Sequence, residues 1–163
     1  MKNYINYFLS KAGLQVSRLP PKTIINIFRE KVLLEDKIER IYDVGASDGR
    51  YAKEVRSAFQ GEILSFEPQA EMFYRLEDAK QRDNNWRAFN KALGTSEKKI
   101  NLNISKNKDS SSILPILETH TTATPDASYI ATEVVEQVRL DDFIISNNID
   151  LKPSFMKLDV QGY

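Results

Sequence analysis

The chain has no cysteine and a single histidine, His120, among its 163 residues. It therefore cannot form a disulfide, a thiolate zinc site or a cysteine nucleophile, and we expect no metal site built on several histidines. An excess of charge is also missing, because 23 basic side chains balance 23 acidic ones. Without net charge the protein has no overall field that attracts nucleic acid, so nucleic acid is not an expected partner. The lack of cysteine fits a cytoplasmic location best.

Long hydrophobic runs are missing as well. No apolar stretch approaches the roughly 20 residues of a membrane-spanning helix, so we expect no membrane span. Residues 1–19 nevertheless carry apolar side chains at helical spacing, which predicts an amphipathic helix. Asn6 and Lys11 interrupt the apolar stretch, which argues against a secretory signal. The helix could lie on a membrane surface, on the domain or on a partner subunit, and a second helix is predicted over residues 23–34.

What is present is the composition of one folded domain, with 41% hydrophobic and 28% charged residues. An N-terminal helical segment is predicted over residues 1–37 and an α/β domain over residues 38–163. In the domain, short apolar runs alternate with helical patterns, which is typical of a mostly parallel sheet. Strands are expected at residues 40–44, 63–67, 86–89, 100–104, 133–140 and 155–159, and helices after Gly49, Pro68 and Leu140. Residues 106–128 are predicted to form a long, partly mobile loop that could act as a lid.

A glycine turn follows the first predicted strand, in the segment Ile41-Tyr42-Asp43-Val44-Gly45-Ala46-Ser47-Asp48-Gly49. Gly45 and Gly49 would let the backbone approach a ligand, and the amides of the next helix would face it. The second predicted strand ends at Glu67, whose carboxylate could accept hydrogen bonds from the two hydroxyls of a ribose. A glycine turn followed by a strand with an acidic end predicts a nucleotide-like ligand.

Two familiar nucleotide motifs do not fit this turn. The dinucleotide fingerprint requires glycine where the chain has Ser47 and Arg50, and no segment supplies a phosphate-binding P-loop. Asp43 and Asp48 would be poor neighbours for a pyrophosphate and good ones for a cation. The residues therefore favour a sulfonium cofactor, and a nicotinamide-dependent oxidoreductase is disfavoured.

Six segments together resemble one known family. Tyr42–Gly49 is similar to motif I of class I S-adenosylmethionine-dependent methyltransferases, and Ser65-Phe66-Glu67-Pro68 to their acidic second-strand motif. More specifically, the chain resembles the FkbM family. The matching segments are Asn90-Lys91-Ala92-Leu93-Gly94, Ser110-Ser111-Ser112-Ile113-Leu114, Val138-Arg139-Leu140-Asp141-Asp142-Phe143 and Phe155-Met156-Lys157-Leu158-Asp159-Val160-Gln161-Gly162-Tyr163. The resemblance runs from about Ile38 to Tyr163, with the motifs in family order.

The resemblance implies a Rossmann-like class I methyltransferase sheet in three layers, with S-adenosyl-L-methionine as the cofactor. The methionine part of the cofactor would be wrapped by Asp43, Gly45, Ala46, Ser47, Asp48 and Gly49. By the same resemblance, Glu67 and Pro68 would hold the ribose, and Asn90 and Ala92 would lie near the adenine. Asp159 would face the methyl group and the acceptor as the catalytic carboxylate.

Structural roles remain open for several of these residues. Asp43 could cap the following turn, Asn90 could satisfy turn backbone, and Asp159 could form an ion pair with Lys157 at the end of the sheet. His120 lies in a threonine-rich loop, where a solvated side chain is expected.

The family implies O-methylation of a sugar or another small hydroxylated metabolite. Its seven-stranded sheet exceeds what residues 38–163 can supply, so we expect a domain that is incomplete at its C-terminus. The alternative is therefore a truncated, catalytically inactive cofactor-binding domain. An unpaired sheet edge or the N-terminal helix would then invite self-association.

Overall fold

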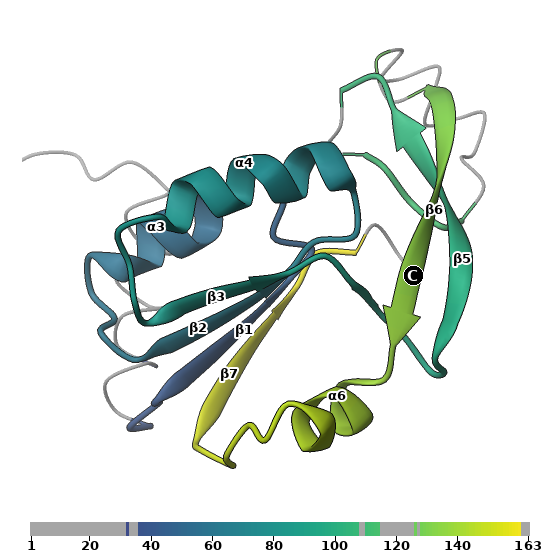
Figure 1. The fold of residues 1–163 in the computed structure, drawn as a ribbon. Coiled ribbons are helices and arrows are strands. Elements are labelled where there is room, and N and C mark those ends of the chain that lie inside the picture. The colour runs from purple at the N-terminus through teal and green to yellow at the C-terminus, as the bar shows by residue number, and fades with distance from the viewer. Residues whose placement is uncertain (1–31, 33–35, 108–109, 115–125, 127, 161–163) are drawn as a thin grey trace, which may run out of the picture.

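A four-stranded parallel sheet, in the order β3-β2-β1-β7, forms the centre of the protein (Figure 1). The computed structural model describes residues 32, 36–107, 110–114, 126 and 128–160. The bounds of the four strands are Arg40–Val44 for β1, Glu62–Phe66 for β2, Trp86–Phe89 for β3 and Ser154–Leu158 for β7. The structure thus confirms the predicted mixed α/β fold with a mostly parallel central sheet.

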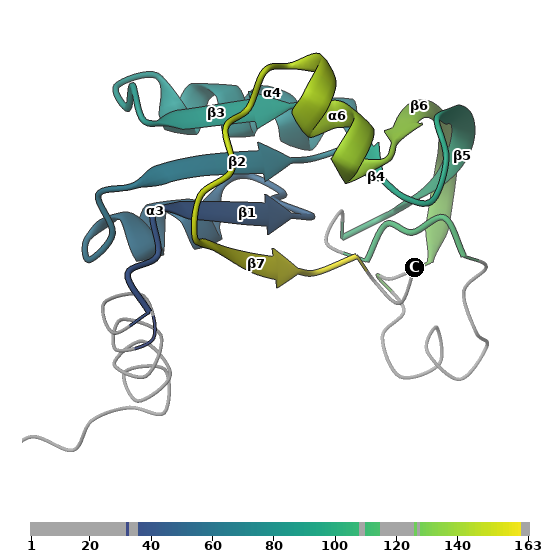
Figure 2. The ribbon, with the colours of Figure 1, turned by 90° about the horizontal axis from the view of Figure 1, so that it is seen from below.

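Helices cover both faces of this sheet and make the three predicted layers (Figures 1 and 2). Helices α3 (Arg50–Arg56) and α4 (Ala70–Lys80) lie on one face, and α6 (Leu140–Ser146) lies on the other. Because both faces are covered, every residue of β1 is buried. No helix in the described part of the chain is long and apolar enough to cross a bilayer.

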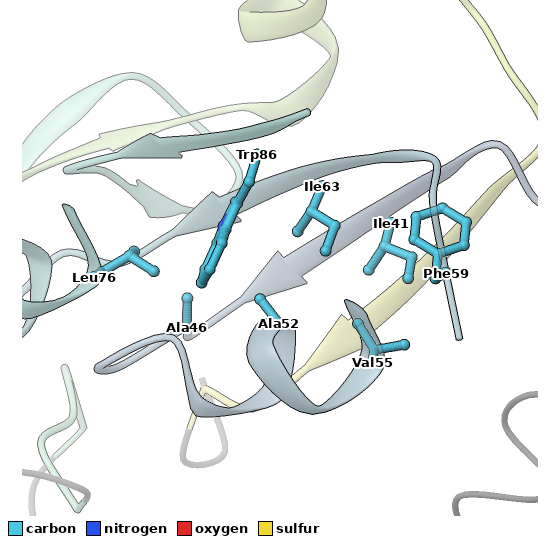
Figure 3. Close-up of a cluster of buried hydrophobic side chains, with 8 residues drawn as sticks. All are labelled: Ile41, Ala46, Ala52, Val55, Phe59, Ile63, Leu76 and Trp86. Carbon is cyan, nitrogen blue, oxygen red and sulfur yellow. The ribbon is translucent and has the colours of Figure 1, made fainter. Parts of the chain in front are cut away.

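Two hydrophobic clusters hold the layers together. One joins the sheet to α3 and α4 and consists of Ile41, Ala46, Ala52, Val55, Phe59, Ile63, Leu76 and Trp86 (Figure 3). The other lies under α6 and consists of Tyr42, Val44, Leu64, Phe66, Phe143 and Ile149. On β1, Ile41 thus belongs to the first cluster and Tyr42 and Val44 to the second, in keeping with the pleat of a strand.

A second, three-stranded sheet lies beyond the carboxyl ends of the central strands (Figure 1). Its order is β4-β6-β5, with β4 at Ala92–Leu93, β5 at Lys98–Ser105 and β6 at Tyr129–Val138. The sequence did not predict this separate sheet. A strand of two residues carries no periodic pattern. Strand β6 begins four residues before the predicted strand, and the added residues, Tyr129, Ile130, Ala131 and Thr132, do not alternate between buried and exposed positions.

Several sequence predictions fall outside the described residues. These are the two N-terminal helices, His120, most of the predicted loop at residues 106–128, and Gln161-Gly162-Tyr163. The other predicted helices and strands are present, with ends shifted by a few residues.

Candidate functional site

A cleft of about 440 Å³ opens between the carboxyl ends of the central strands and the second sheet. The chain crosses from β3 to the far side of β1 to form β7, so the strand order reverses at β1. Ligands of open α/β sheets bind at such a reversal, outside the carboxyl ends of the strands. The volume also lies within the range of about 300–1,000 Å³ that small-molecule sites have.

The glycine turn forms one side of the cleft. After β1 the backbone amides of Gly45 and Ala46 both donate to the carbonyl of Phe66, over 3.0 and 3.1 Å. Gly45 has a φ of +71°, and a Cβ on it would lie 2.0 Å from the backbone oxygen of Asp159. The amide of Asp159 in turn donates to the carbonyl of Val44 over 3.0 Å. Glycine is therefore needed here, because the turn after β1 lies in direct contact with the backbone after β7.

Glu67 lies at the end of β2 with a side chain that is 7% exposed. Its Oε2 accepts a hydrogen bond from the Ser47 amide over 2.7 Å, and its Oε1 accepts one from the Gln69 amide over 2.9 Å. Burial raises the pKa of Glu67 to about 7, although these two bonds and the charge of Lys157 oppose the rise. Each carboxylate oxygen can accept a further hydrogen bond, so Glu67 can still receive hydroxyl donors from the cleft.

A buried ion pair joins β1 to β7 beside the cleft. Asp43 is fully buried, and Lys157 lies opposite it in the strand register, with its Nζ 3.0 Å from Asp43 Oδ1. Burial raises the pKa of Asp43, while Lys157 and a hydrogen bond from the Ser65 hydroxyl act in the opposite direction. The Asp43 charge is therefore matched within the protein, and the expectation that it would favour a cationic ligand needs correction.

Most of the predicted site residues line the cleft together. These are Gly45, Ala46, Ser47, Asp48, Glu67, Pro68, Ala92 and Asp159. Asp159 is the most exposed of the carboxylates discussed above, with a side chain that is 60% exposed and an Oδ2 atom 3.8 Å from Lys157 Nζ. The structure thus brings these residues together around one cleft, and their roles stay predictions.

Three of the predicted residues do not line the cleft, and each of them has contacts that support the fold instead. Asp43 pairs with Lys157. Gly49, with a φ of +80°, has no room for a Cβ because Leu76 and Trp86 pack against it. Asn90 is exposed and donates to the backbone oxygens of Glu67 and Pro68, both over 2.9 Å, which is the turn role left open for it.

Strand β5 and the segment that follows it contribute a wall that sequence reasoning did not assign to the site. Leu102, Ser111, Ser112 and Ile113 line this wall. Ser111 donates to the buried Gln69 side chain over 3.1 Å, which connects the wall to the backbone that holds Glu67. The serine-rich segment was the available signal, but only the folded chain shows which surface it faces.

Comparison with known proteins supports the family resemblance. Residues 43–163 match the protein-family model of the methyltransferase FkbM domain. The matched region contains the glycine turn, Glu67, the serine-rich segment and Asp159. A search of curated proteins found none that matches.

Proposed function

The chain belongs to the FkbM methyltransferase family, and we propose that it transfers a methyl group from S-adenosyl-L-methionine to a hydroxyl oxygen of a sugar or another small hydroxylated metabolite. The observation that carries the proposal is the buried carboxylate of Glu67, which lies in the same cleft as the glycine turn and Asp159. That arrangement supplies one acceptor for a ribose and a second carboxylate for a reacting hydroxyl.

The residues of the cleft fit an adenosyl cofactor. Glu67 retains acceptor capacity for the ribose hydroxyls, as argued above. Apolar side chains beside it, from Phe66, Ala92 and Leu93, offer surface to an adenine ring. Asp48 and Asp159 line the same cleft. Their carboxylates lie 3.6 Å from Arg50 and 3.8 Å from Lys157, but the two side chains are 34% and 60% exposed, so they can still attract a positively charged group. The cofactor, when bound, supplies a methyl group that is activated by a positively charged sulfur.

The protein would contribute to the reaction by aligning the acceptor with the methyl carbon and by removing the hydroxyl proton. Fixing the acceptor relative to the reacting carbon can contribute up to roughly 7–11 kcal/mol. We assign Asp159 to the acceptor hydroxyl, because its exposed carboxylate can accept the hydroxyl proton at the rim of the cleft. The acceptor oxygen would gain the methyl group as the carbon–sulfur bond of the cofactor breaks, S-adenosylhomocysteine would leave as the neutral thioether, and Asp159 would take the hydroxyl proton.

Turnover with a panel of sugars and hydroxylated metabolites tests this proposal, with release of S-adenosylhomocysteine as the measured product. Asp159→Asn should lower kcat by about 100-fold or more, the usual contribution of a general base, while the affinity for S-adenosylhomocysteine stays nearly unchanged. Cofactor binding without turnover on any acceptor would favour the alternative of an inactive cofactor-binding domain. An Asp159→Asn variant with full activity would remove Asp159 from the mechanism.

Cytoplasmic location and self-association stay predictions. The sheet edge is one basis for the second, because β7 is the last strand of the described sheet and its Met156 and Leu158 side chains are 42% and 65% exposed. Sedimentation of the protein over a range of concentrations tests for association.

A further inference from the structure

Lys157 is the most buried of the cations that line the cleft. Its side chain is 18% exposed, and its ammonium lies 3.0 Å from Asp43 Oδ1. It also donates to the Gly45 carbonyl over 2.6 Å and to the Val44 carbonyl over 3.4 Å. The same ammonium lies 3.8 Å from Asp159 Oδ2. The Lys157 ammonium therefore lies close to Asp43, to the glycine turn and to Asp159.

These contacts exceed what charge neutralisation of Asp43 requires. A lysine that only balanced Asp43 would need no bond to the turn, whereas the bond to Gly45 is the shortest that Lys157 makes. Carbonyls that receive a charged donor are held firmly, because such bonds are roughly twice as strong as neutral ones. The turn is held from the other side as well, since the Gly45 and Ala46 amides donate to Phe66.

We propose that Lys157 is a positioning residue for cofactor binding: its ammonium fixes the glycine turn relative to Glu67. This rests on the proposed function for its ligand, but the restraint on the turn belongs to the free protein. Lys157 acts through the groups it holds, and contact with substrate is not part of its role.

The charge of Lys157 also affects the ionisation of the two buried carboxylates near it. Burial raises the pKa of Glu67 and of Asp43, and the charge of Lys157 opposes the rise at both. The other groups that bear on Glu67 are the amides of Gln69 and Ser47 and the charge of Asp43. Asp43 in turn receives the Ser65 hydrogen bond and the charge of Asp159. Loss of Lys157 should therefore shift the ionisation of Glu67 to higher pH.

The test compares Lys157→Met with the double variant Asp43→Asn/Lys157→Met and with the control Lys152→Met. Lys152 precedes β7 at the other end of the sheet, where it pairs with Asp150 over 3.2 Å. The double variant removes the buried charge that Lys157→Met would leave unpaired, and we therefore expect it to fold. Titration with S-adenosylhomocysteine between pH 5.5 and 8.5 (about one and a half units either side of the Glu67 pKa) measures affinity and its pH dependence.

We expect Lys157→Met and the double variant to lose about tenfold or more in affinity. In Lys157→Met, the midpoint of the pH dependence should also move upward, which a purely structural defect would not cause. Recovery of wild-type affinity in the double variant would overturn the proposal, because Lys157 would then only neutralise Asp43. An unchanged Lys157→Met variant would overturn it too.

A measurement without ligand separates this proposal from the proposed function. Amide hydrogen exchange at Gly45, Ala46 and Ser47 should be faster in the double variant than in the wild type, and unchanged in Lys152→Met. Equal exchange in the wild type and the double variant contradicts the positioning role. Failure of the wild type to bind S-adenosylhomocysteine contradicts the proposed function instead, and the exchange comparison still decides the role of Lys157.

Discussion

At the scale of a single residue, burial and hydrogen bonding act in opposite directions on the pKa of Glu67. Two backbone amides favour its charged form, yet its pKa is raised to about 7 because burial disfavours charge more strongly. The protein thus keeps a carboxylate that changes charge near neutral pH at the point where a ribose would bind.

The stability of the protein should depend on pH through this group. The folded pKa of about 7 lies above the ordinary value of 4.5, so the folded protein binds more protons than the unfolded chain between these values. The free energy of unfolding should therefore fall, by up to about 3 kcal/mol, as pH rises from 4.5 to 7. Urea unfolding across this range should show the decline in the wild type.

Glu67→Gln is the matched variant for this prediction, because its side chain does not titrate. Its amide group must place an N–H against the amide of Ser47 or Gln69, so some stability is lost at every pH. The difference between the two proteins is the informative quantity, since other groups, including Asp43, titrate in both. A difference that stays constant from pH 4.5 to 7 would refute the raised pKa of Glu67.

Gly45 is a second position where a change of one side-chain atom should alter the stability of the protein. An alanine there must adopt a φ of +71° and place its Cβ 2.0 Å from the Asp159 oxygen. We expect Gly45→Ala to lower the free energy of unfolding by at least about 2 kcal/mol. Gly94→Ala is the comparison, because Gly94 does not have a positive φ and the three atoms nearest its added Cβ would all belong to the side chain of Gln137. Denaturant unfolding of both variants measures the costs, and an equal or smaller cost for Gly45→Ala would contradict this account.

Among the elements, the start of α4 connects the two sheets. The residue before this helix, Gln69, makes no side-chain capping bond, and the amide of Ala70 instead donates to Glu133 of β6 over 3.1 Å. A carboxylate near a helix N-terminus satisfies a free amide and complements the helix dipole. Glu133 therefore caps α4 from the second sheet and helps to fix the wall of the cleft.

Removal of this cap should loosen the second sheet. Glu133→Ala is expected to cost about 1 kcal/mol, the typical value for a lost N-cap, and to accelerate amide exchange in the first turn of α4. Glu136→Ala on the same strand is the control, because Glu136 pairs with Lys91 on the surface, where ion pairs contribute little. If the two variants behaved alike, the capping role would be disproved.

The sequence allowed prediction of those elements whose pattern is set locally. Strands β1 and β2 are short, almost wholly buried runs, and α4 buries Met72 and Leu76 at helical spacing. The second sheet could not be predicted, since the register of β5 against β6 depends on contacts across a long connection. Asp43 and Lys157 show the same limit within the site. They are far apart in sequence, and only the parallel pairing of β1 with β7 brings them together.

At the scale of the whole molecule, the reversal of strand order places all parts of the site at one edge. The glycine turn follows β1, Glu67 follows β2, Asp159 follows β7, and the second sheet closes the opposite side. The glycine turn, Glu67 and Asp159 all lie within residues 43–163, which match the FkbM domain. The central claim is that this cleft binds an adenosyl cofactor through Glu67.

Isothermal titration of the protein with S-adenosylhomocysteine, S-adenosylmethionine and NAD tests that claim most directly. Glu67→Ala serves as the variant, and Glu71→Ala, which removes a surface partner of Arg75, serves as the control. We predict that both adenosyl compounds bind at one site per chain, that Glu67→Ala weakens them by about tenfold or more, and that NAD does not bind. Absence of binding by both adenosyl compounds, or equal binding by the wild type and Glu67→Ala, would contradict the claim.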